Sequence, residues 1–241
     1  MTIMEYLNFS KENIPVNNDY QLIVIGGGTS GSIAAISAAR MGINTLLIEK
    51  AGALGGTATL GQVTPMMSVK IDGNPAISVI GKEIKEMLYK DGYGAMDSSG
   101  NDGWFNPEML KFVLEEIYLD IGGHLLYDTE FIEPLVKEDR IEAVIVYNKG
   151  GLQAYHAQQF IDCTGDADLA FLSGVTCKRG FDQGKFQALS LRFLAANIDL
   201  KAFGGFLTEQ GQDWGLEYPL IETAMVWNRG FALEKIFKKG L

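Results

Sequence analysis

The feature that most constrains the fold of this chain is a glycine-rich turn near its beginning. Residues 21–25 form an apolar run that is typical of a buried strand, and glycines follow at Gly26, Gly28 and Gly31. A segment rich in small apolar residues then predicts a helix over residues 29–41. A strand, a G-x-G-x-x-G turn and a helix in this order are typical of a βαβ unit that binds the diphosphate of a dinucleotide.

Each glycine of this turn has its own predicted role. Gly26 would permit the tight turn, Gly28 would let the backbone approach the diphosphate, and Gly31 would let the helix pack closely on the strand. The amides at the start of the helix would face the diphosphate. The next apolar run, residues 44–49, ends in Glu49, whose carboxylate could accept hydrogen bonds from a ribose diol and would repel a 2′-phosphate. The alternative interpretation is a tight turn that binds no ligand.

Composition narrows the partners that this chain could have. Its 241 residues suffice for one large domain or one and a half. A formal net charge of −10 argues against nucleic acid and anionic membranes as partners. No stretch approaches the ~18–20 apolar residues of a membrane span, and residues 1–20 lack the apolar core of a signal peptide. Two cysteines cannot hold a four-cysteine iron–sulfur cluster, and we expect both to be reduced in the cytoplasm.

The rest of the chain predicts further α/β structure with an antiparallel insertion. Helices are expected at 76–90 and 106–120, and the second opens on an Asn-Pro sequence that suits a helix start. Glycine-rich loops are expected at 51–64 and 91–103. A longer strand is expected over 186–196. Short strands, one further buried strand and a short helix are expected, in that order, at 124–127, 130–137, 141–147, 152–157, 160–163 and 168–173.

Two further motifs make the pattern more specific. Gly55-Gly56-Thr57 follows the second strand, and residues 161–169 read Ile-Asp-Cys-Thr-Gly-Asp-Ala-Asp-Leu. Together with residues 25–31 and 47–50, these motifs make the chain resemble a known family over roughly residues 20–200. The family is the FAD-dependent oxidoreductases of the glutathione-reductase-like, two-dinucleotide-binding-domain flavoproteins, which are allied to the fumarate-reductase flavoproteins.

The resemblance implies an α/β fold with two parts. The first is a Rossmann-like FAD-binding domain with a central parallel sheet, an N-terminal βαβ unit and a small antiparallel meander. The second is the start of a substrate-side domain. The implied boundaries are a lead-in at 1–19, the FAD-binding domain at 20–180 and the incomplete substrate-side domain at 181–241.

The resemblance also implies a set of FAD contacts. The glycine turn would hold the diphosphate, Glu49 the adenosine ribose with Lys50 beside it, and the backbone of Phe131 the adenine. The glycine loop after the second strand would run along the diphosphate and the ribityl chain, where its amides could form an anion-binding concavity. The third motif would make a second contact near the nucleotide. The predicted cofactor contacts are Gly26, Gly28, Thr29, Ser30, Gly31, Glu49, Lys50, Gly55, Gly56, Thr57, Phe131, Thr164, Gly165 and Asp166.

Two of these assignments have structural alternatives. The Gly55–Gly56 pair could be a plain mobile turn, and Asp166 could be a helix cap.

Other chemistry-bearing residues give no assignment. His124 and His156 are isolated from further ligands in the sequence, so we predict structural roles for both and no metal site. The two cysteines lack the C-x-x-C spacing of a redox disulfide. Arg179 and Arg192 could anchor a carboxylate, but solvated arginines are commoner. Neither a catalytic residue nor the substrate is predicted.

The function that we expect is that of an FAD-dependent oxidoreductase, or of its nucleotide-binding part. Hydride would pass between a small organic substrate and the flavin N5 atom. Two alternatives stay open: a partner-dependent or non-catalytic flavin-binding subunit, and a flavin-free enzyme that uses the same pocket for NAD, as thiazole-synthase relatives do. Members of the family are usually longer than this chain. We therefore expect either a truncated chain, or a homo-oligomer or second polypeptide that completes the flavin site.

Overall fold

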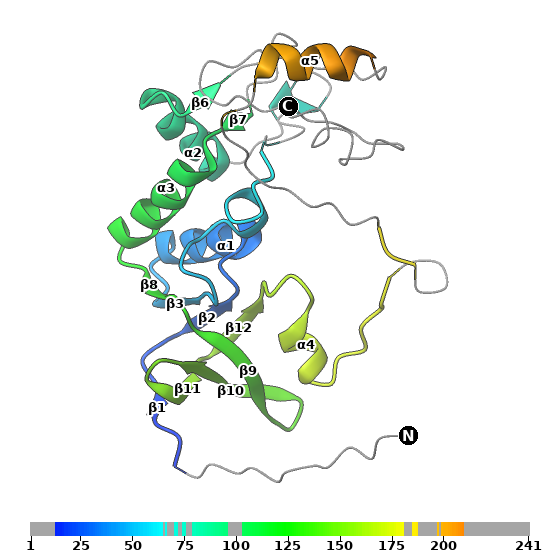
Figure 1. The fold of residues 1–241 in the computed structure, drawn as a ribbon. Coiled ribbons are helices and arrows are strands. Elements are labelled where there is room, and N and C mark those ends of the chain that lie inside the picture. The colour runs from blue at the N-terminus through cyan, green and yellow to red at the C-terminus, as the bar shows by residue number, and fades with distance from the viewer. Residues whose placement is uncertain are drawn as a thin grey trace, which may run out of the picture. The chain divides into compact units, whose positions relative to one another are not determined.

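The computed structural model describes residues 13–64, 66, 70–71, 74–75, 79–95, 103–180, 185–187, 197 and 199–209 (Figure 1). The chain divides into two compact units. The first unit comprises residues 1–60 and 111–186, and the second unit comprises residues 61–110 and 187–241. Residues 61–110, which belong to the second unit, lie within the range 20–180 over which we expect the nucleotide-binding domain.

A four-stranded parallel sheet forms the centre of the first unit. Its order is β12–β2–β3–β8, and every neighbouring pair is parallel. The two central strands are buried at every residue, as expected for strands that are covered on both faces. The bounds are Leu22–Ile25 for β2, Thr45–Ile48 for β3, His124–Leu126 for β8 and Gln159–Asp162 for β12.

The predicted βαβ unit is confirmed. Helix α1 (Thr29–Arg40) connects β2 to β3 and contacts both strands. It ends at Met41, and Gly42 then adopts a φ of 77°, which is the left-handed conformation that a glycine C′ residue supplies. The local pattern of apolar residues was sufficient to predict this unit, because its strand, turn and helix follow one another without any insertion.

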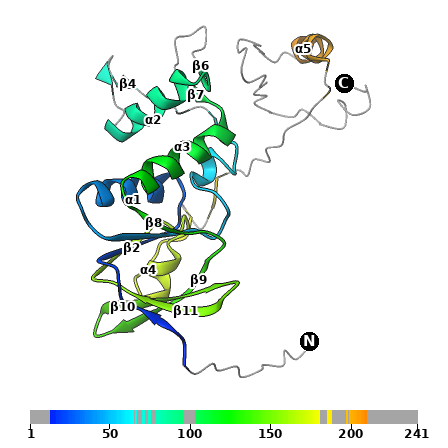
Figure 2. The ribbon, with the colours of Figure 1, turned by 90° about the vertical axis from the view of Figure 1, so that its left-hand side faces the viewer.

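Helices cover one face of the parallel sheet, and a second sheet covers the other (Figure 2). Helix α3 (Pro107–Asp120) begins in the second unit, and from residue 111 onward it belongs to the first. Its predicted start is confirmed, because the Asn106 side chain accepts a hydrogen bond from the amide of Glu108 at 2.9 Å. Near its other end, the hydroxyl of Tyr118 donates to the carbonyl oxygen of Thr45 at 2.9 Å and so ties the helix to β3.

The second sheet contains the predicted antiparallel meander. Its order is β1–β11–β10–β9, and the last three strands pair antiparallel. Strand β1 pairs in parallel with β11, so part of the expected lead-in belongs to this sheet. The bounds are Val16–Asn17 for β1, Glu130–Lys137 for β9, Arg140–Asn148 for β10 and Gly151–His156 for β11.

The main hydrophobic core lies between the two sheets. It joins one face of β2 and β3 to β10, β11 and the short helix α4 (Asp168–Leu172). Its buried members are Ile23, Ile25, Leu46, Ile48, Val144, Val146, Tyr155 and Leu169.

One strand prediction was wrong in its burial. We expected residues 160–163 to form a buried strand, but β12 lies at the edge of the parallel sheet and most of its residues are only half-buried.

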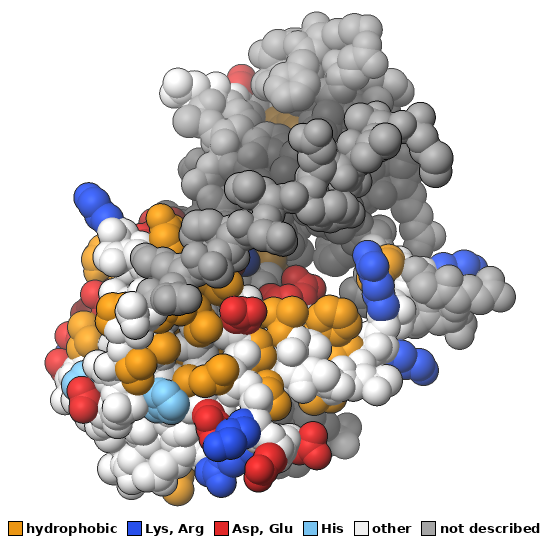
Figure 3. Space-filling view, turned by 90° about the horizontal axis from the view of Figure 1, so that it is seen from below, with side chains coloured by type: hydrophobic (Ala, Val, Ile, Leu, Met, Phe, Trp, Pro, Cys, Tyr) orange, Lys and Arg blue, Asp and Glu red, His pale blue; other side chains and the backbone are white. Residues whose placement is uncertain are grey.

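Apolar side chains are exposed around β9 and α4, and Figure 3 shows apolar patches among charged groups on this part of the first unit. The largest of these exposed fractions belong to Phe171, Val175 and Phe186.

In the second unit, the described residues form short strands and helices. Helix α2 (Val79–Lys90) confirms the predicted helix over the residues that are described. The expected loop at 91–103 contains strand β6 (Gly94–Ala95), which pairs antiparallel with β7 (Trp104–Phe105). The remaining elements are β4 (Lys70–Ile71), β5 (Asn74–Pro75) and α5 (Leu200–Glu209).

Most of the strand expected at 186–196 lies outside the described residues, and so does Arg192. The described part, residues 186–187, is not in a strand. Among the helices that the structure describes, none has the length and apolar character needed to cross a membrane.

Candidate cofactor-binding site

Three loops meet at the carboxyl ends of β2, β3 and β12. The carboxyl ends of parallel strands lie at one edge of a sheet, which is where open α/β sheets bind ligands. Backbone hydrogen bonds join the loops directly. The amide of Gly55 donates to the carbonyl oxygen of Gly27 at 2.9 Å, and the amide of Cys163 donates to that of Ile25 at 2.8 Å. The structure thus brings together the glycine turn, the Gly55–Thr57 loop and the loop that begins at Cys163.

Packing within the protein explains two of the three motif glycines. Gly26 has a φ of +95°, and an added Cβ there would overlap the carbonyl oxygen of Cys163. An added Cβ at Gly31 would overlap the carbonyl oxygen of Gly26, because α1 packs directly on the turn. The predicted tight turn and close helix packing are both present.

Packing within the protein does not explain the remaining glycine. Gly28 has a φ of −63°, which any residue can adopt, and an added Cβ there would meet no atom within 4 Å. Gly28 is also the N-cap of α1, and no side chain caps this helix start. The N-terminal end of α1, where Thr29 and Ser30 lie, therefore opens onto free space beside Gly28. This is a cradle that suits an anionic group such as a diphosphate.

The second glycine loop is fixed against this cradle. Gly55 and Gly56 have φ values of 95° and 50°, and Gly56 begins a short 3-10 helix, Gly56–Ala58. An added Cβ at Gly56 would lie 2.9 Å from the Cα of Gly28. The hydroxyl of Thr29 donates to the carbonyl oxygen of Gly55 at 3.1 Å. These contacts hold the loop beside the start of α1, with Thr57 in its 3-10 turn.

Glu49 has a structural role that sequence reasoning missed. Its side chain is buried, with 8% exposed. One carboxylate oxygen accepts the amide of Gly27 at 2.5 Å, and the other accepts the amide of Ala51 at 2.7 Å. Each oxygen retains a further acceptor position, so these bonds are compatible with a ribose diol. The neighbouring Lys50 is exposed.

The third loop contains a second carboxylate that sequence reasoning missed. Asp162, at the end of β12, accepts the amide of Ala170 at 2.9 Å near the start of α4. Asp166 is exposed, and the N-cap position is Ala167, so the alternative that Asp166 caps the helix is wrong. The Asp-x-Thr spacing before a helix is the signal that could have found Asp162, because aspartate often bonds the amide two residues on.

Phe131 is connected to the same region through the start of β9. It is half-buried against the core between the sheets, opposite Val146. The amide of Thr129, just before β9, donates to the carbonyl oxygen of Glu49 at 3.1 Å. The beginning of β9 therefore lies next to the end of β3, on the side where Glu49 is found.

Among the described residues, we find no pair of titratable side chains near the site that is arranged for acid–base catalysis. Burial, with the negative charge of Asp162 as a smaller cause, raises the pKa of the Cys163 thiol above its ordinary value. Burial raises the pKa of Tyr127, whose hydroxyl donates to Glu115 at 2.7 Å. Cys177 is exposed and Arg179 stacks over the Phe186 ring at 5.7 Å. We assign no catalytic residue among these groups.

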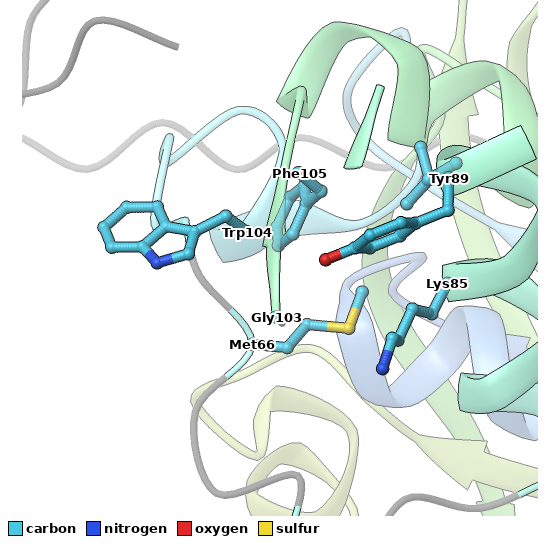
Figure 4. A pocket seen from close by; sticks show the side chains of 7 residues that line it. Met66, Lys85, Tyr89, Gly103, Trp104 and Phe105 are labelled. Carbon is cyan, nitrogen blue, oxygen red and sulfur yellow. The ribbon is translucent and has the colours of Figure 1, made fainter. Parts of the chain in front are cut away.

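Neither a metal site nor another pocket competes with the cradle at Gly28 among the described residues. Within the described part of the chain, no three His, Cys, Asp or Glu residues are grouped so that they could hold a metal ion. A small hollow in the second unit is lined mainly by apolar side chains, and Met66, Tyr89 and Phe105 point toward one another there (Figure 4). Its one cation, Lys85, lies 5.8 Å from the Tyr89 ring centroid. The cradle at Gly28 remains the candidate site.

Comparison with known proteins decides the family. Residues 21–232 match the family model described as FAD dependent oxidoreductase. The chain belongs to this FAD-dependent oxidoreductase family. FAD is accordingly the cofactor that the cradle at Gly28 has to fit, and its diphosphate suits the open helix start.

Individual relatives match stretches of very different length. Dihydrolipoyl dehydrogenase of Trypanosoma brucei brucei is 54% identical over 43 residues, which is 18% of this chain and 9% of that protein. Leghemoglobin reductase of Vigna unguiculata is 25% identical over 219 residues, which covers 83% of this chain and 37% of that protein. L-proline dehydrogenase from P. horikoshii matches with a TM-score of 0.47 and 14% identity, over 69% of this chain and 58% of that one. The chain thus spans well under half the length of these two sequence relatives.

Proposed function

We propose that this chain binds the ADP half of FAD at the glycine turn and serves as the nucleotide-binding part of an FAD-dependent oxidoreductase. The observation that supports this most directly is the open space at Gly28. A glycine there has no purpose in the packing of the chain itself, whereas both neighbouring motif glycines do. A ligand that approaches the backbone closely explains why a side chain is missing at this position.

The diphosphate would be held mainly by backbone groups. The open N-terminal end of α1, at Thr29 and Ser30, would provide amides and the positive end of the helix dipole. Gly26 and Gly31 would set the shape of the turn. The Gly55–Thr57 loop, fixed beside Gly28, would continue along the diphosphate toward the ribityl chain.

The adenosine end would be held by the residues around Glu49. Its carboxylate would accept hydrogen bonds from the ribose diol while it keeps the amides of Gly27 and Ala51. Its negative charge disfavours a 2′-phosphate. Lys50 would lie beside the ribose, and the backbone of Phe131 would contact the adenine. Thr164, Gly165 and Asp166 would form a second wall of the nucleotide site.

Bound FAD would supply the hydride acceptor and donor, and the chain's own groups would bind and orient it. We propose a small organic molecule as substrate. The two sequence relatives are named dihydrolipoyl dehydrogenase and leghemoglobin reductase, but the matches cover only 9% and 37% of those proteins, so we assign neither substrate to this chain. The domain assignment that we propose is an FAD-binding part within 20–180 and a substrate-side part from 181.

The two free cysteines are consistent with a reducing compartment, and we propose the cytoplasm.

The test of this proposal is the absorption spectrum of the purified 241-residue chain, followed by mass analysis of the ligand released on denaturation. We expect the visible bands of a flavin and the mass of FAD. A colourless protein that releases NAD or an ADP-ribose adduct would contradict the proposal. If FAD is bound but candidate substrates fail to bleach its visible absorption, the chain is a flavin-binding subunit that depends on a partner for activity.

A further inference from the structure

The carboxylate of Asp162 links three segments of the first unit at the edge of the candidate site. One oxygen accepts the amide of Thr164 at 3.0 Å and its hydroxyl at 2.8 Å. The other oxygen accepts the amide of Ala170 at 2.9 Å. The carboxylate therefore joins the end of β12, the loop that follows it and the first turn of α4, which are adjacent along the chain in Figure 1.

The start of α4 depends on this arrangement. Its N-cap, Ala167, has a φ of 60° and no side chain that can accept a hydrogen bond. The amide of Asp168 instead donates to the hydroxyl of Thr164 at 2.8 Å, and that hydroxyl donates onward to Asp162. The side chains of Asp162 and Thr164 thus satisfy amides that a helix start normally leaves open. The Thr164–Asp166 loop is therefore held both to the end of β12 and to the first turn of α4.

The same loop forms one wall of the glycine turn. The amide of Cys163 donates to the carbonyl oxygen of Ile25, and the carbonyl oxygen of Cys163 lies where a Cβ at Gly26 would be. No side chain separates the loop from the turn at this point. A displacement of the loop would therefore change the surface that faces the start of α1.

We propose that Asp162 is a positioning residue for FAD binding: it holds the Thr164–Asp166 loop against the glycine turn without contacting the cofactor. This inference rests on the proposed function, since it concerns the same FAD site. It explains why a carboxylate is needed at this position, because three donors converge on it from two directions and a carboxylate offers acceptors on both oxygens.

Asp162→Asn is the informative substitution because it preserves size and removes only half of the acceptors. The amide group of asparagine has one carbonyl oxygen, so its NH₂ must face either the Thr164 donors or the amide of Ala170. We expect FAD to bind about tenfold more weakly or worse in a fluorescence titration. Hydrogen exchange at the amides of Thr164 and Ala170 should also accelerate.

Substitutions at Thr164 test the relay through its hydroxyl. Thr164→Ser keeps the hydroxyl, so hydrogen exchange at the amide of Asp168, which donates to that hydroxyl, should stay slow. Thr164→Val removes the hydroxyl and should accelerate this exchange and weaken FAD binding. Because Asp162 and Thr164 share one side-chain hydrogen bond, the double variant Asp162→Asn with Thr164→Val should lose less affinity than the two single losses combined.

Two controls separate positioning from general effects. Asp139→Asn removes the same charge from the exposed β9–β10 turn and should leave the FAD dissociation constant unchanged. Val144→Ala makes a cavity in the core between the sheets and lowers the unfolding midpoint without touching the loop. At a temperature where all variants are folded, Asp162→Asn should lose far more FAD affinity than Val144→Ala.

The outcomes distinguish this inference from the proposed function. If the natural sequence does not bind FAD, both are overturned. If the natural sequence binds FAD and Asp162→Asn binds it equally well, only the positioning role is overturned. Equal losses of affinity in Asp162→Asn and Val144→Ala would also overturn it, since the effect would then follow stability alone.

Discussion

At the scale of single residues, the glycines of the turn divide into two kinds. Gly26 and Gly31 are required by contacts within the chain, whereas Gly28 faces open space and adopts an ordinary backbone conformation. Substitutions at these positions should therefore fail in different ways. Changes at the first kind should damage the fold, and changes at the second should damage only what binds there.

Gly31→Ala should destabilise the first unit strongly. The added Cβ would overlap the carbonyl oxygen of Gly26, and this is a backbone atom rather than the end of a flexible side chain that could move away. We expect a loss of about 3 kcal/mol or more in the free energy of unfolding, measured by urea denaturation. A midpoint equal to that of the natural sequence would show that α1 does not pack on the turn as described.

Ala167→Gly should stabilise the chain slightly. Ala167 has a φ of 60°, a left-handed conformation that costs a non-glycine residue about 1–2 kcal/mol. Glycine removes this strain but adds entropy to the unfolded chain, so we expect a net gain of about 0.5–1 kcal/mol. Thermal unfolding measures the difference, and a lower melting temperature would argue against the left-handed conformation.

At the scale of elements, the first unit is held together by a few side chains that connect distant segments. Tyr118 of α3 is fully buried, and its hydroxyl lies 2.9 Å from the carbonyl oxygen of Thr45 and 3.2 Å from that of His124. It thereby joins the helix layer to β3 and β8. Glu49 similarly joins the loops that follow β2 and β3, and Asp162 joins the end of β12 to the first turn of α4.

Tyr118→Phe should cost about 1 kcal/mol of stability, because the buried carbonyl oxygens lose a hydrogen-bond donor while the ring stays packed.

The Tyr118 hydroxyl should also make the free energy of unfolding depend on pH. Burial raises the pKa of Tyr118 above its ordinary value of 10.0, so the folded protein keeps a proton that the unfolded chain loses. The stabilisation is complete below pH 10 and declines as the pH rises above it.

The measurement is urea unfolding at several pH values. Above pH 10, the free energy of unfolding should fall more steeply for the natural sequence than for Tyr118→Phe. If the free energy of unfolding falls equally steeply with pH in both proteins, the burial of the Tyr118 hydroxyl is contradicted. Tyr127, whose pKa burial also raises, remains in both proteins and serves as a common background.

At the scale of the whole molecule, the sequence predicted the elements that are adjacent along the chain. Strand β2, helix α1 and strand β3 were predicted because their apolar periods and glycines are local signals. The edge position of β12 was not, since an apolar run cannot show how many neighbours a strand has. The pairing of β1 with β11 was also missed, because it joins residues 16–17 to residues 154–155, which lie far apart in the sequence.

For the candidate site, the sequence predicted the positions of the glycines but not the hydrogen bonds of the side chains. The glycine positions follow from a spacing that is visible in the sequence. The hydrogen bonds that the Gly27 amide donates to Glu49 and the Ala170 amide donates to Asp162 do not follow from the spacing, because each depends on how a carboxylate meets an amide from another element. The place of residues 61–110 in the second unit likewise depends on contacts far apart in the chain.

The central claim, that FAD binds at Gly28, is tested most directly by the FAD content of Gly28→Val. The added side chain meets no protein atom within 4 Å at its Cβ, so the fold should survive. Gly205→Val is a matched control, because Gly205 also has open space but lies in the second unit. We predict at least a tenfold loss of bound FAD per chain for Gly28→Val, with unchanged far-UV circular dichroism, and no loss for Gly205→Val. Normal FAD content in Gly28→Val would contradict the account.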